Sequence, residues 1–369
     1  MGNALKFRVQ VGVEEPAYVS CLGNGKVGVV SEDYPFVFIY AVDMETGEVA
    51  WKQDGYEVFG HVSHPLYDGD TAYLAMRKPS GGSKFLAAQN TATGDEAWRC
   101  MLTNSTYQFM VPLAQSSGYV AVCNSNAGTL IIIDKTTGKA ACKMKLKHGM
   151  YDYEPNLLAW GEQFITLVPL KQTYGIDLYD PTQTGGFVRT ISESLDRRIC
   201  RKILVGDDLF YFTDTGIFSK VNLVTGEAGF SEKIYDTEES FYFSRQITHV
   251  DGILYCGVEI DDKFYLFTYD IAGNKWEFNP LELRHDPIFH GNILPLCGSM
   301  GYLLWDEGIL KYDVSNGGTC EEVTLEGFKE NFGKSFVRLH ADKYNESWMV
   351  AEDKLVVVND EGELFCWEI

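Results

Sequence analysis

Histidine pairs come closest in this sequence to the spacing of a metal site. His61 and His64 are three positions apart, and His285 and His290 form a second pair. Imidazole nitrogens bind Zn²⁺ and other transition metals. Residues three apart on a strand point to opposite faces, so His61 and His64 could share one metal only if the chain turned between them. No third ligand is identifiable from spacing, and we therefore expect no metal site.

Catalytic and cofactor chemistry also lack a signal. The chain contains no G-x-S-x-G nucleophile motif. Its Gly-Gly pairs at residues 81–82, 185–186 and 317–318 are typical of hairpin turns rather than of phosphate-binding loops. We therefore expect no catalytic residue and no bound cofactor, and we interpret the protein as a non-enzyme.

Carboxylates interleaved with aromatic residues are the recurring chemical feature. Four segments carry them: Asp54, Tyr56, Glu57 and Phe59; Tyr151, Asp152, Tyr153 and Glu154; Asp236, Glu238, Glu239, Phe241 and Tyr242; and His285, Asp286 and His290. Aromatic side chains supply contact area and carboxylates supply charge complementarity, so together they predict a binding site for a basic protein. The alternative is that the rings pack inward beneath their loops.

A repeated turn separates these segments. An acidic or amide residue ends an apolar run and a Gly follows four positions later in the copies that begin at Asp43, Asn90, Asp134 and Asn222; looser copies begin at Asp180, Asp270 and Asp313. Successive copies begin 47, 44, 46, 42, 48 and 43 positions apart. A period of about 45 residues predicts one four-stranded antiparallel sheet per repeat, and hence an all-β protein with the β-propeller fold.

The composition of the turn has a mechanical reason. Gly adopts positive φ without a steric cost and can close the hairpin between two strands. The Asp or Asn side chain can accept hydrogen bonds from backbone N–H groups further round the turn. Trp51 and Trp98 each stand four residues after a turn Gly. We expect these rings to pack one blade against its neighbour.

The two ends of the chain predict the number of blades. Residues 348–351, 354–358 and 364–367 form three strand-like runs before the chain stops at Ile369, and residues 5–11 alternate as a strand ahead of the first complete repeat. We predict that residues 5–11 complete a last blade formed by about residues 346–369, because such closure hides exposed strand edges. The expected architecture is a single β-propeller domain of residues 1–369 with eight blades, and seven blades is the alternative.

The repeat resembles that of the pyrroloquinoline-quinone (PQQ)-type, quinoprotein-like eight-bladed propellers. An apolar strand, Asp-x-x-Thr-Gly and then x-x-x-Trp carry the resemblance, most closely at residues 41–51, and it covers essentially the whole chain. Quinoprotein dehydrogenases of that superfamily are much longer, and many hold a calcium and a vicinal disulfide beside the quinone. This chain has no Cys-Cys pair. The resemblance therefore implies a non-catalytic member, similar in length to the lipoprotein subunit of the outer-membrane β-barrel assembly machinery.

The net charge limits which partners are expected, and the first residues of the chain indicate the compartment. The 52 acidic against 31 basic residues give a formal net charge of −21. Such a charge repels phosphates, so we expect no nucleic acid and no membrane as partner. The first 16 residues lack the apolar core of a secretory signal peptide. We expect a cytoplasmic monomer.

The predicted function follows from where propeller loops lie. Connections between blades are expected near residues 53–61, 147–155, 234–244 and 279–291, and they would gather the acidic-aromatic segments on one face. We predict a protein-binding propeller that uses this face for a basic partner, for example an immunity protein or adaptor that neutralises a bacterial effector. The alternatives are a small quinoprotein-like oxidoreductase, or another enzyme with its site at the central channel, and an envelope assembly scaffold.

Overall fold

The computed structural model describes most of the chain in segments. The described residues are 3–11, 17–33, 36–57, 66–77, 84–103, 113–124, 128–146, 157–169, 173–196, 199–213, 215–235, 241–243, 247–261, 263–281, 299–313, 319–332, 348–351, 353–359 and 361–369. They fall into two compact units. The larger unit comprises Phe7–Asp196 and Asp342–Cys366, and the smaller unit comprises Met1–Lys6, Arg197–Ala341 and Trp367–Ile369.

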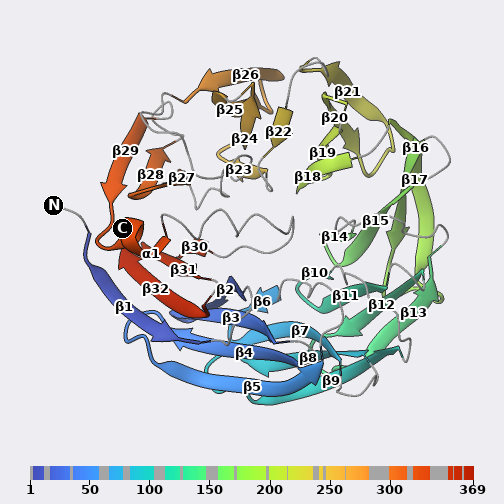
Figure 1. The fold of residues 1–369 in the computed structure, drawn as a ribbon. Helices are drawn as coiled ribbons and strands as arrows, with labels where there is room; N and C mark the ends of the chain where they lie inside the picture. The colour runs from blue at the N-terminus through green and yellow to red at the C-terminus, as the bar shows by residue number, and fades with distance from the viewer. Residues whose placement is uncertain are drawn as a thin grey trace. The chain divides into compact units, whose positions relative to one another are not determined.

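The larger unit contains four sheets of four consecutive strands each (Figure 1). Blade 1 is β2 (Ala17–Gly23), β3 (Lys26–Asp33), β4 (Phe36–Asp43) and β5 (Val49–Glu57); blade 2 is β6 (Leu66–Asp68), β7 (Thr71–Arg77), β8 (Lys84–Asn90) and β9 (Glu96–Thr103). Blade 3 is β10 (Leu113–Gln115), β11 (Tyr119–Asn124), β12 (Thr129–Asp134) and β13 (Ala140–Lys145); blade 4 is β14 (Leu157–Trp160), β15 (Gln163–Pro169), β16 (Thr173–Tyr179) and β17 (Phe187–Asp196).

The smaller unit contains three sheets. Blade 5 is β18 (Ile199–Val205), β19 (Asp208–Thr213), β20 (Ile217–Asn222) and β21 (Ala228–Lys233). Blade 6 is β22 (Phe241–Phe243), β23 (Thr248–Val250), β24 (Ile253–Ile260), β25 (Lys263–Asp270) and β26 (Lys275–Pro280), with β22 and β23 both pairing with β24. Blade 7 has three described strands, β27 (Met300–Trp305), β28 (Gly308–Asp313) and β29 (Thr319–Thr324), and is followed by the one-turn helix α1 (Phe328–Phe332).

The N-terminal strand completes the eighth sheet, as predicted. Its order is β1 (Leu5–Gln10), β32 (Glu363–Glu368), β31 (Lys354–Val358) and β30 (Trp348–Ala351) (Figure 1). The Val11 amide donates to the Gly362 carbonyl at 2.8 Å, and Arg8 forms an ion pair with Glu363. The eight sheets confirm the all-β, eight-bladed propeller over the seven-bladed alternative.

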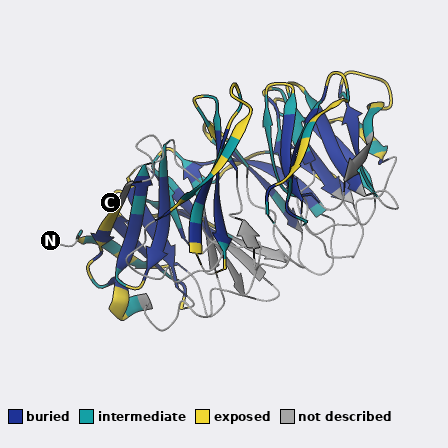
Figure 2. Ribbon diagram, turned by 90° about the horizontal axis from the view of Figure 1, so that it is seen from above, coloured by how far each residue is buried: buried dark blue, intermediate teal, exposed yellow. Residues whose placement is uncertain are grey.

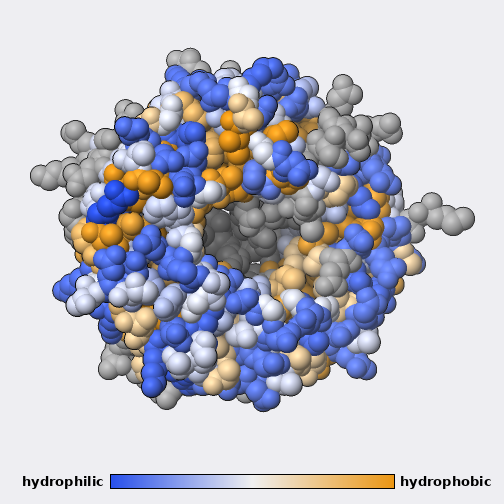
Figure 3. Space-filling view, turned by 180° about the vertical axis from the view of Figure 1, so that it is seen from behind, coloured by the Kyte–Doolittle hydropathy of each residue, from blue (hydrophilic) through white to orange (hydrophobic). Residues whose placement is uncertain are grey.

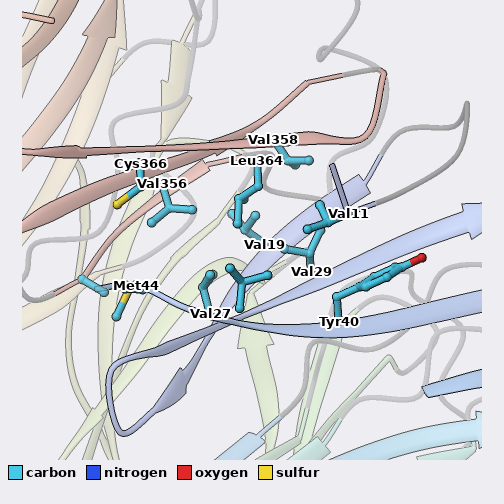
Figure 4. Packing of buried hydrophobic residues seen from close by; sticks show 12 residues of the cluster. Val11, Val19, Val27, Val29, Tyr40, Met44, Val356, Val358, Leu364 and Cys366 are labelled. Carbon is cyan, nitrogen blue, oxygen red and sulfur yellow. The ribbon is translucent and has the colours of Figure 1, made fainter. Parts of the chain in front are cut away.

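Adjacent blades meet through apolar side chains that strand alternation places between the sheets. Between blades 8 and 1, Val27 and Val29 of β3 pack with Val356 of β31 and Leu364 of β32 (Figure 4). All four residues are 0 % exposed. Figure 2 shows the same division in other blades, with buried residues along the strands and exposed residues at the hairpin turns. Burial of apolar area between sheets is therefore the main stabilising contribution to the fold.

The repeated turn forms as its composition predicts. In the turn between β4 and β5, the Asp43 Oδ1 accepts hydrogen bonds from the amides of Glu45 at 2.9 Å and Thr46 at 3.0 Å. Asn90 and Asn222 make the same pair of bonds in blades 2 and 5. The turn after Asp270 differs in one respect, because the residue with positive φ is Asn274, at 49°, rather than Gly273. Asn tolerates this left-handed conformation better than most residues.

Each tryptophan after a turn docks on the corresponding turn of the next blade. The Trp51 Nε1 donates to the Thr91 carbonyl at 2.8 Å, and the Trp98 Nε1 donates to the Lys135 carbonyl at 2.8 Å. The ring of Trp98 lies so close to Gly138 that an added Cβ there would be 2.6 Å from the ring. Glycine is therefore required twice at this position, for its positive φ of 67° and for its missing side chain.

Glu162 links the turns of blades 3 and 4. Its carboxylate accepts hydrogen bonds from the Ser116 hydroxyl at 2.8 Å, the Ser117 hydroxyl and the Gly118 amide at 3.1 Å. These bonds favour the ionised form, and the one from Ser117 contributes most to lowering the pKa of Glu162 below its ordinary value of 4.5. The ionised carboxylate is thus part of the contact between the two blades.

Replacing glycine by alanine at two positions of blade 3 separates backbone strain from the ring contact. Gly128 has a φ of 56° and nothing lies within 4 Å of an added Cβ, whereas Gly138 faces Trp98. We expect Gly128→Ala to cost about 1 kcal/mol of unfolding free energy through φ alone. Gly138→Ala should cost roughly 2–4 kcal/mol, because the overlap with the ring adds to the strain. Urea unfolding of both variants measures this difference, and equal costs would contradict the docking role of Trp98.

Substituting Glu162→Gln tests the carboxylate between blades 3 and 4 by its pH dependence. Because the folded-state pKa is lowered, the ionised group stabilises the fold above its unfolded pKa of about 4.5, and this contribution is lost as the pH falls through the folded pKa. We expect the variant to be less stable at neutral pH by under about 1 kcal/mol, since the group is exposed. The deficit should narrow under acidic conditions.

Urea midpoints measured from neutral pH down to acid conditions check the expectation for Glu162. Glu330→Gln, at an exposed glutamate of α1, is the matched control. A deficit that stays constant across this range would show that the charge of Glu162 contributes nothing.

Candidate protein-interaction surface

The predicted binding residues divide into those whose backbone the structure describes and those outside it. Five lie in described strands: Asp54, Tyr56, Glu57, Phe241 and Tyr242. The others lie outside the described residues: Phe59, Tyr151, Asp152, Tyr153, Glu154, Asp236, Glu238, Glu239, His285, Asp286 and His290. The histidines of the metal hypothesis, His61 and His64, also lie outside. The acidic-aromatic face as a whole therefore stays a prediction.

The first segment belongs to a strand rather than to a loop, which corrects the expected boundary at residue 53. β5 continues to Glu57, with Tyr56 paired to Val37 and Glu57 paired to Phe36. The Asp54-Gly55 dipeptide is a strong turn signal. Here the register with β4 shifts between Val37 and Ile39, so the extra residue is accommodated as a β-bulge within the ladder.

The third segment is corrected in the same way. Phe241 and Tyr242 form most of the short strand β22, where they pair with Ile260 and Glu259 of β24. The loop predicted for residues 234–244 is thus interrupted by a strand. β24 offers a free edge here because β23 pairs only with its first residues, Ile253–Tyr255. A residue type that is common in strands, such as Phe or Tyr, then extends the sheet.

Both described segments lie at the same end of their own blades. In blade 1, Glu57 pairs with the first residue of β4, so it lies at the end of the sheet opposite the Asp43 turn. In blade 6, Phe241 pairs with the last residue of β24, opposite the turn at Asp251 and Gly252. We call the end of a blade where Glu57 or Phe241 lies its loop end. The opposite end, where the Asp43 turn or the turn at Asp251 and Gly252 lies, is its turn end. The predicted binding residues that can be placed are at the loop end.

Carboxylates at the turn end accept hydrogen bonds from residues of their own turns. Backbone hydrogen bonds from Thr46 and Thr137 are the main reason that the pKa values of Asp43 and Asp134 are lowered. The Thr182 hydroxyl is the largest cause of the lowered pKa of Asp180. These three groups are ionised at neutral pH and hold the local backbone, so they serve structure at this end.

Lysines at the turn end of the larger unit contact the neighbouring blade. Lys135 of blade 3 forms an ion pair with Asp68 of blade 2 at 2.6 Å, and its side chain is 9 % exposed. Lys354 of blade 8 forms an ion pair with Glu45 of blade 1 at 2.6 Å. Because these charges are partly withdrawn from water, each ion pair fixes one blade relative to the next. The turn end is therefore dominated by contacts between blades.

Reactive groups are sparse in the described part of the chain. Within it, no three His, Cys, Asp or Glu side chains are grouped so that they could hold a metal ion. The described cysteines, Cys21, Cys100, Cys123, Cys142, Cys200, Cys256 and Cys366, are free thiols. Burial raises the pKa of Cys123 to about 12, which keeps its thiol protonated. In the same residues no helix is long and apolar enough to cross a membrane.

A basic strand is the feature that the sequence reasoning missed. Lys139, Lys143 and Lys145 are exposed on β13 or directly before it, at the outer edge of blade 3. The spacing of these lysines at every second or fourth position of residues 139–145 was the sequence signal that could have indicated a basic strand. The overall excess of acidic residues concealed it, because a net charge gives no information about where the minority charges lie.

Comparison with known proteins supports the propeller assignment. Residues 12–149 match the family described as outer membrane protein assembly factor BamB, a match that spans less than half of the chain. No curated protein matches the sequence.

Solved structures resemble the whole chain at low sequence identity. BamB from Moraxella catarrhalis is 14 % identical with a TM-score of 0.53, and the match covers 98 % of both chains. The computationally designed protein Ika8 is 14 % identical with a TM-score of 0.64, covering 98 % of this chain and 99 % of that one. An uncharacterized protein from Listeria monocytogenes is 12 % identical with a TM-score of 0.53, covering 86 % and 96 %. At such identities the likeness establishes the fold alone: the chain is an eight-bladed β-propeller, and its residues 12–149 carry the PQQ-type repeat.

Proposed function

We propose that this propeller is a non-enzymatic, protein-binding scaffold whose loop end recognises a basic protein. The observation that carries the proposal is the different use of the two ends of the blades. At the turn end, Asp43 and Asp134 hold backbone amides, and Lys135 and Lys354 pair with the neighbouring blade. The loop end carries the acidic-aromatic segments at the positions that are placed, Asp54 to Glu57 and Phe241 to Tyr242.

Net charge supports the basic character of the partner. The chain carries a formal charge of −21, and hydrophilic residues cover much of the described surface in Figure 3. A field of this sign raises the rate at which a cationic protein meets the surface, and local carboxylates then select it. A cytoplasmic immunity protein or adaptor that occludes a basic bacterial effector is the specific form of the proposal.

An envelope assembly scaffold is the second candidate. It is favoured by the match of residues 12–149 to the family described as outer membrane protein assembly factor BamB. Both candidates are protein-binding scaffolds, and they differ in the partner. The first requires a basic soluble protein, and the second requires a component of an outer-membrane assembly machine.

Charge reversal in the predicted loop segments tests the proposal. We expect Glu238→Lys/Glu239→Lys and Asp152→Lys/Glu154→Lys to weaken capture of the partner by at least about tenfold, because each changes the local charge by four units in a charge-selected interface. Proteins retained from a lysate by the wild-type chain and lost with both variants are identified by mass spectrometry, and their affinities are then measured with purified components.

The matched control reverses two charges away from the loop segments. Glu321→Lys/Glu322→Lys lies on the exposed outer strand β29 and should leave capture unchanged. Retained circular dichroism and unfolding midpoints establish that the variants fold. Capture that is insensitive to all loop variants, or equally sensitive to the control, would refute the loop end as the binding surface.

A further inference from the structure

The outer edge of blade 3 differs in charge from the protein as a whole. β13 is the last strand in the order β10-β11-β12-β13, and no further described strand pairs with it (Figure 1). Ala141, Lys143 and Lys145 alternate along it and are exposed. They face away from Cys142 and Met144, which pack toward the apolar cluster shared by blades 3 and 4. In a chain with a net charge of −21, this strand carries exposed lysines without an acidic residue.

Two exposed apolar side chains flank this strand. Met101 of β9 is 49 % exposed, and the Lys143 Nζ donates to the carbonyl of the next residue, Leu102, at 3.2 Å. Phe187 of β17 is 38 % exposed and directly follows Gly186, which lies against the side chain of Met144. An exposed apolar side chain thus stands on the outer strand of blade 2 and another on that of blade 4, the two blades that neighbour the lysines of β13.

The exposed lysines of β13 differ from the structural lysine of the same blade. Lys135 of the same blade is placed in an ion pair with Asp68 and is largely buried, as expected of a structural cation. In the part of the chain that the structure describes, the Lys143 Nζ donates to the Leu102 carbonyl, and an ammonium group has three donors. An unpaired strand edge is a template for a further strand, and exposed lysines on such an edge commonly discourage self-pairing. They also favour an incoming strand of opposite charge.

We propose that β13 is a docking edge for an extended acidic segment of another protein, which adds to blade 3 as a fifth strand. Backbone hydrogen bonds provide the pairing, as in other cases of strand addition. Carboxylates at alternate positions of the incoming segment face Lys143 and Lys145. Its intervening apolar residues point to the other face of the sheet, on the side of Met144 and Phe187. Charge complementarity with Lys143 and Lys145 favours an acidic segment over a basic one. This edge is distinct from the loop end, so the inference does not depend on the proposed function.

A defined peptide tests the proposal. The probe is acetylated Glu-Val-Glu-Val-Glu-Val, which matches the six residues of β13, and its comparison is the Lys-Val peptide of equal length. We expect the acidic peptide to bind the full chain at least about tenfold more tightly than the basic one, and Lys143→Glu/Lys145→Glu to weaken binding by at least about tenfold. Fluorescence anisotropy measures both ratios.

A matched control and a backbone probe make the result specific. Lys263→Glu/Lys275→Glu makes the same charge change on exposed lysines of blade 6 and should alter affinity by less than about twofold, because neither lysine belongs to β13 or to the outer strands of blades 2 and 4. Methylating alternate peptide nitrogens removes ladder donors and should abolish binding, whereas hydrogen exchange at residues 140–145 should slow when the unmodified peptide binds.

Other outcomes overturn the proposal. Affinity that is unchanged by Lys143→Glu/Lys145→Glu, or by methylation of the peptide backbone, excludes strand addition at β13. Binding to vesicles of phosphatidylserine and phosphatidylcholine without binding to the peptide would assign the lysines to an anionic membrane. Self-association in sedimentation velocity that Lys143→Glu/Lys145→Glu abolishes would assign the edge to a second copy of the chain.

Discussion

The larger unit depends on one repeated contact, in which a side chain of one blade lies against the turn glycine of the next. Phe7 lies against Gly47, Trp51 against Gly94 and Trp98 against Gly138. Each of these glycines has positive φ, and each would collide with the facing ring if it carried a Cβ. The contact therefore couples the local conformation of a hairpin to the packing of two sheets. A strand or turn that misfolds in one blade loses its neighbour's ring as well.

The same contact explains why the N-terminal strand is needed. Phe7 occupies in blade 8 the place that Trp51 and Trp98 occupy in blades 1 and 2, because it is the ring that meets the turn of the next blade. Without β1, the turn of blade 1 would lose this ring, and the edge of β32 would lose its ladder partner. An exposed edge of that kind invites pairing with other chains. Pairing of β1 with β32 therefore supplies the ring for the turn of blade 1 and covers the edge of β32.

The sequence predicted this framework well because its signals are local. An Asp or Asn followed by Gly four residues later is read from five residues, and the structure confirms the hydrogen bonds at Asp43, Asn90 and Asn222. The ends of strands were predicted less well, since they depend on whether a partner strand is present. Asp54-Gly55 has the composition of a turn, yet β4 continues beside it and the dipeptide becomes a bulge. The basic edge at Lys143 and Lys145 was missed because composition averages over the whole chain.

The different roles of the turn end and the loop end of the blades affect which residues can be substituted. Ionised groups at the turn end, such as Asp43 and Glu162, stabilise the backbone or a neighbouring blade, so replacing them alters stability before it alters binding. At the loop end, the described residues Tyr56 and Glu57 of blade 1 and Phe241 and Tyr242 of blade 6 are placed by ladder pairing rather than by the repeated turn contact. A propeller of this kind can therefore acquire a new partner through its loops while the turn glycines and their facing rings stay fixed. The contacts that couple one blade to the next thus involve few positions in each repeat.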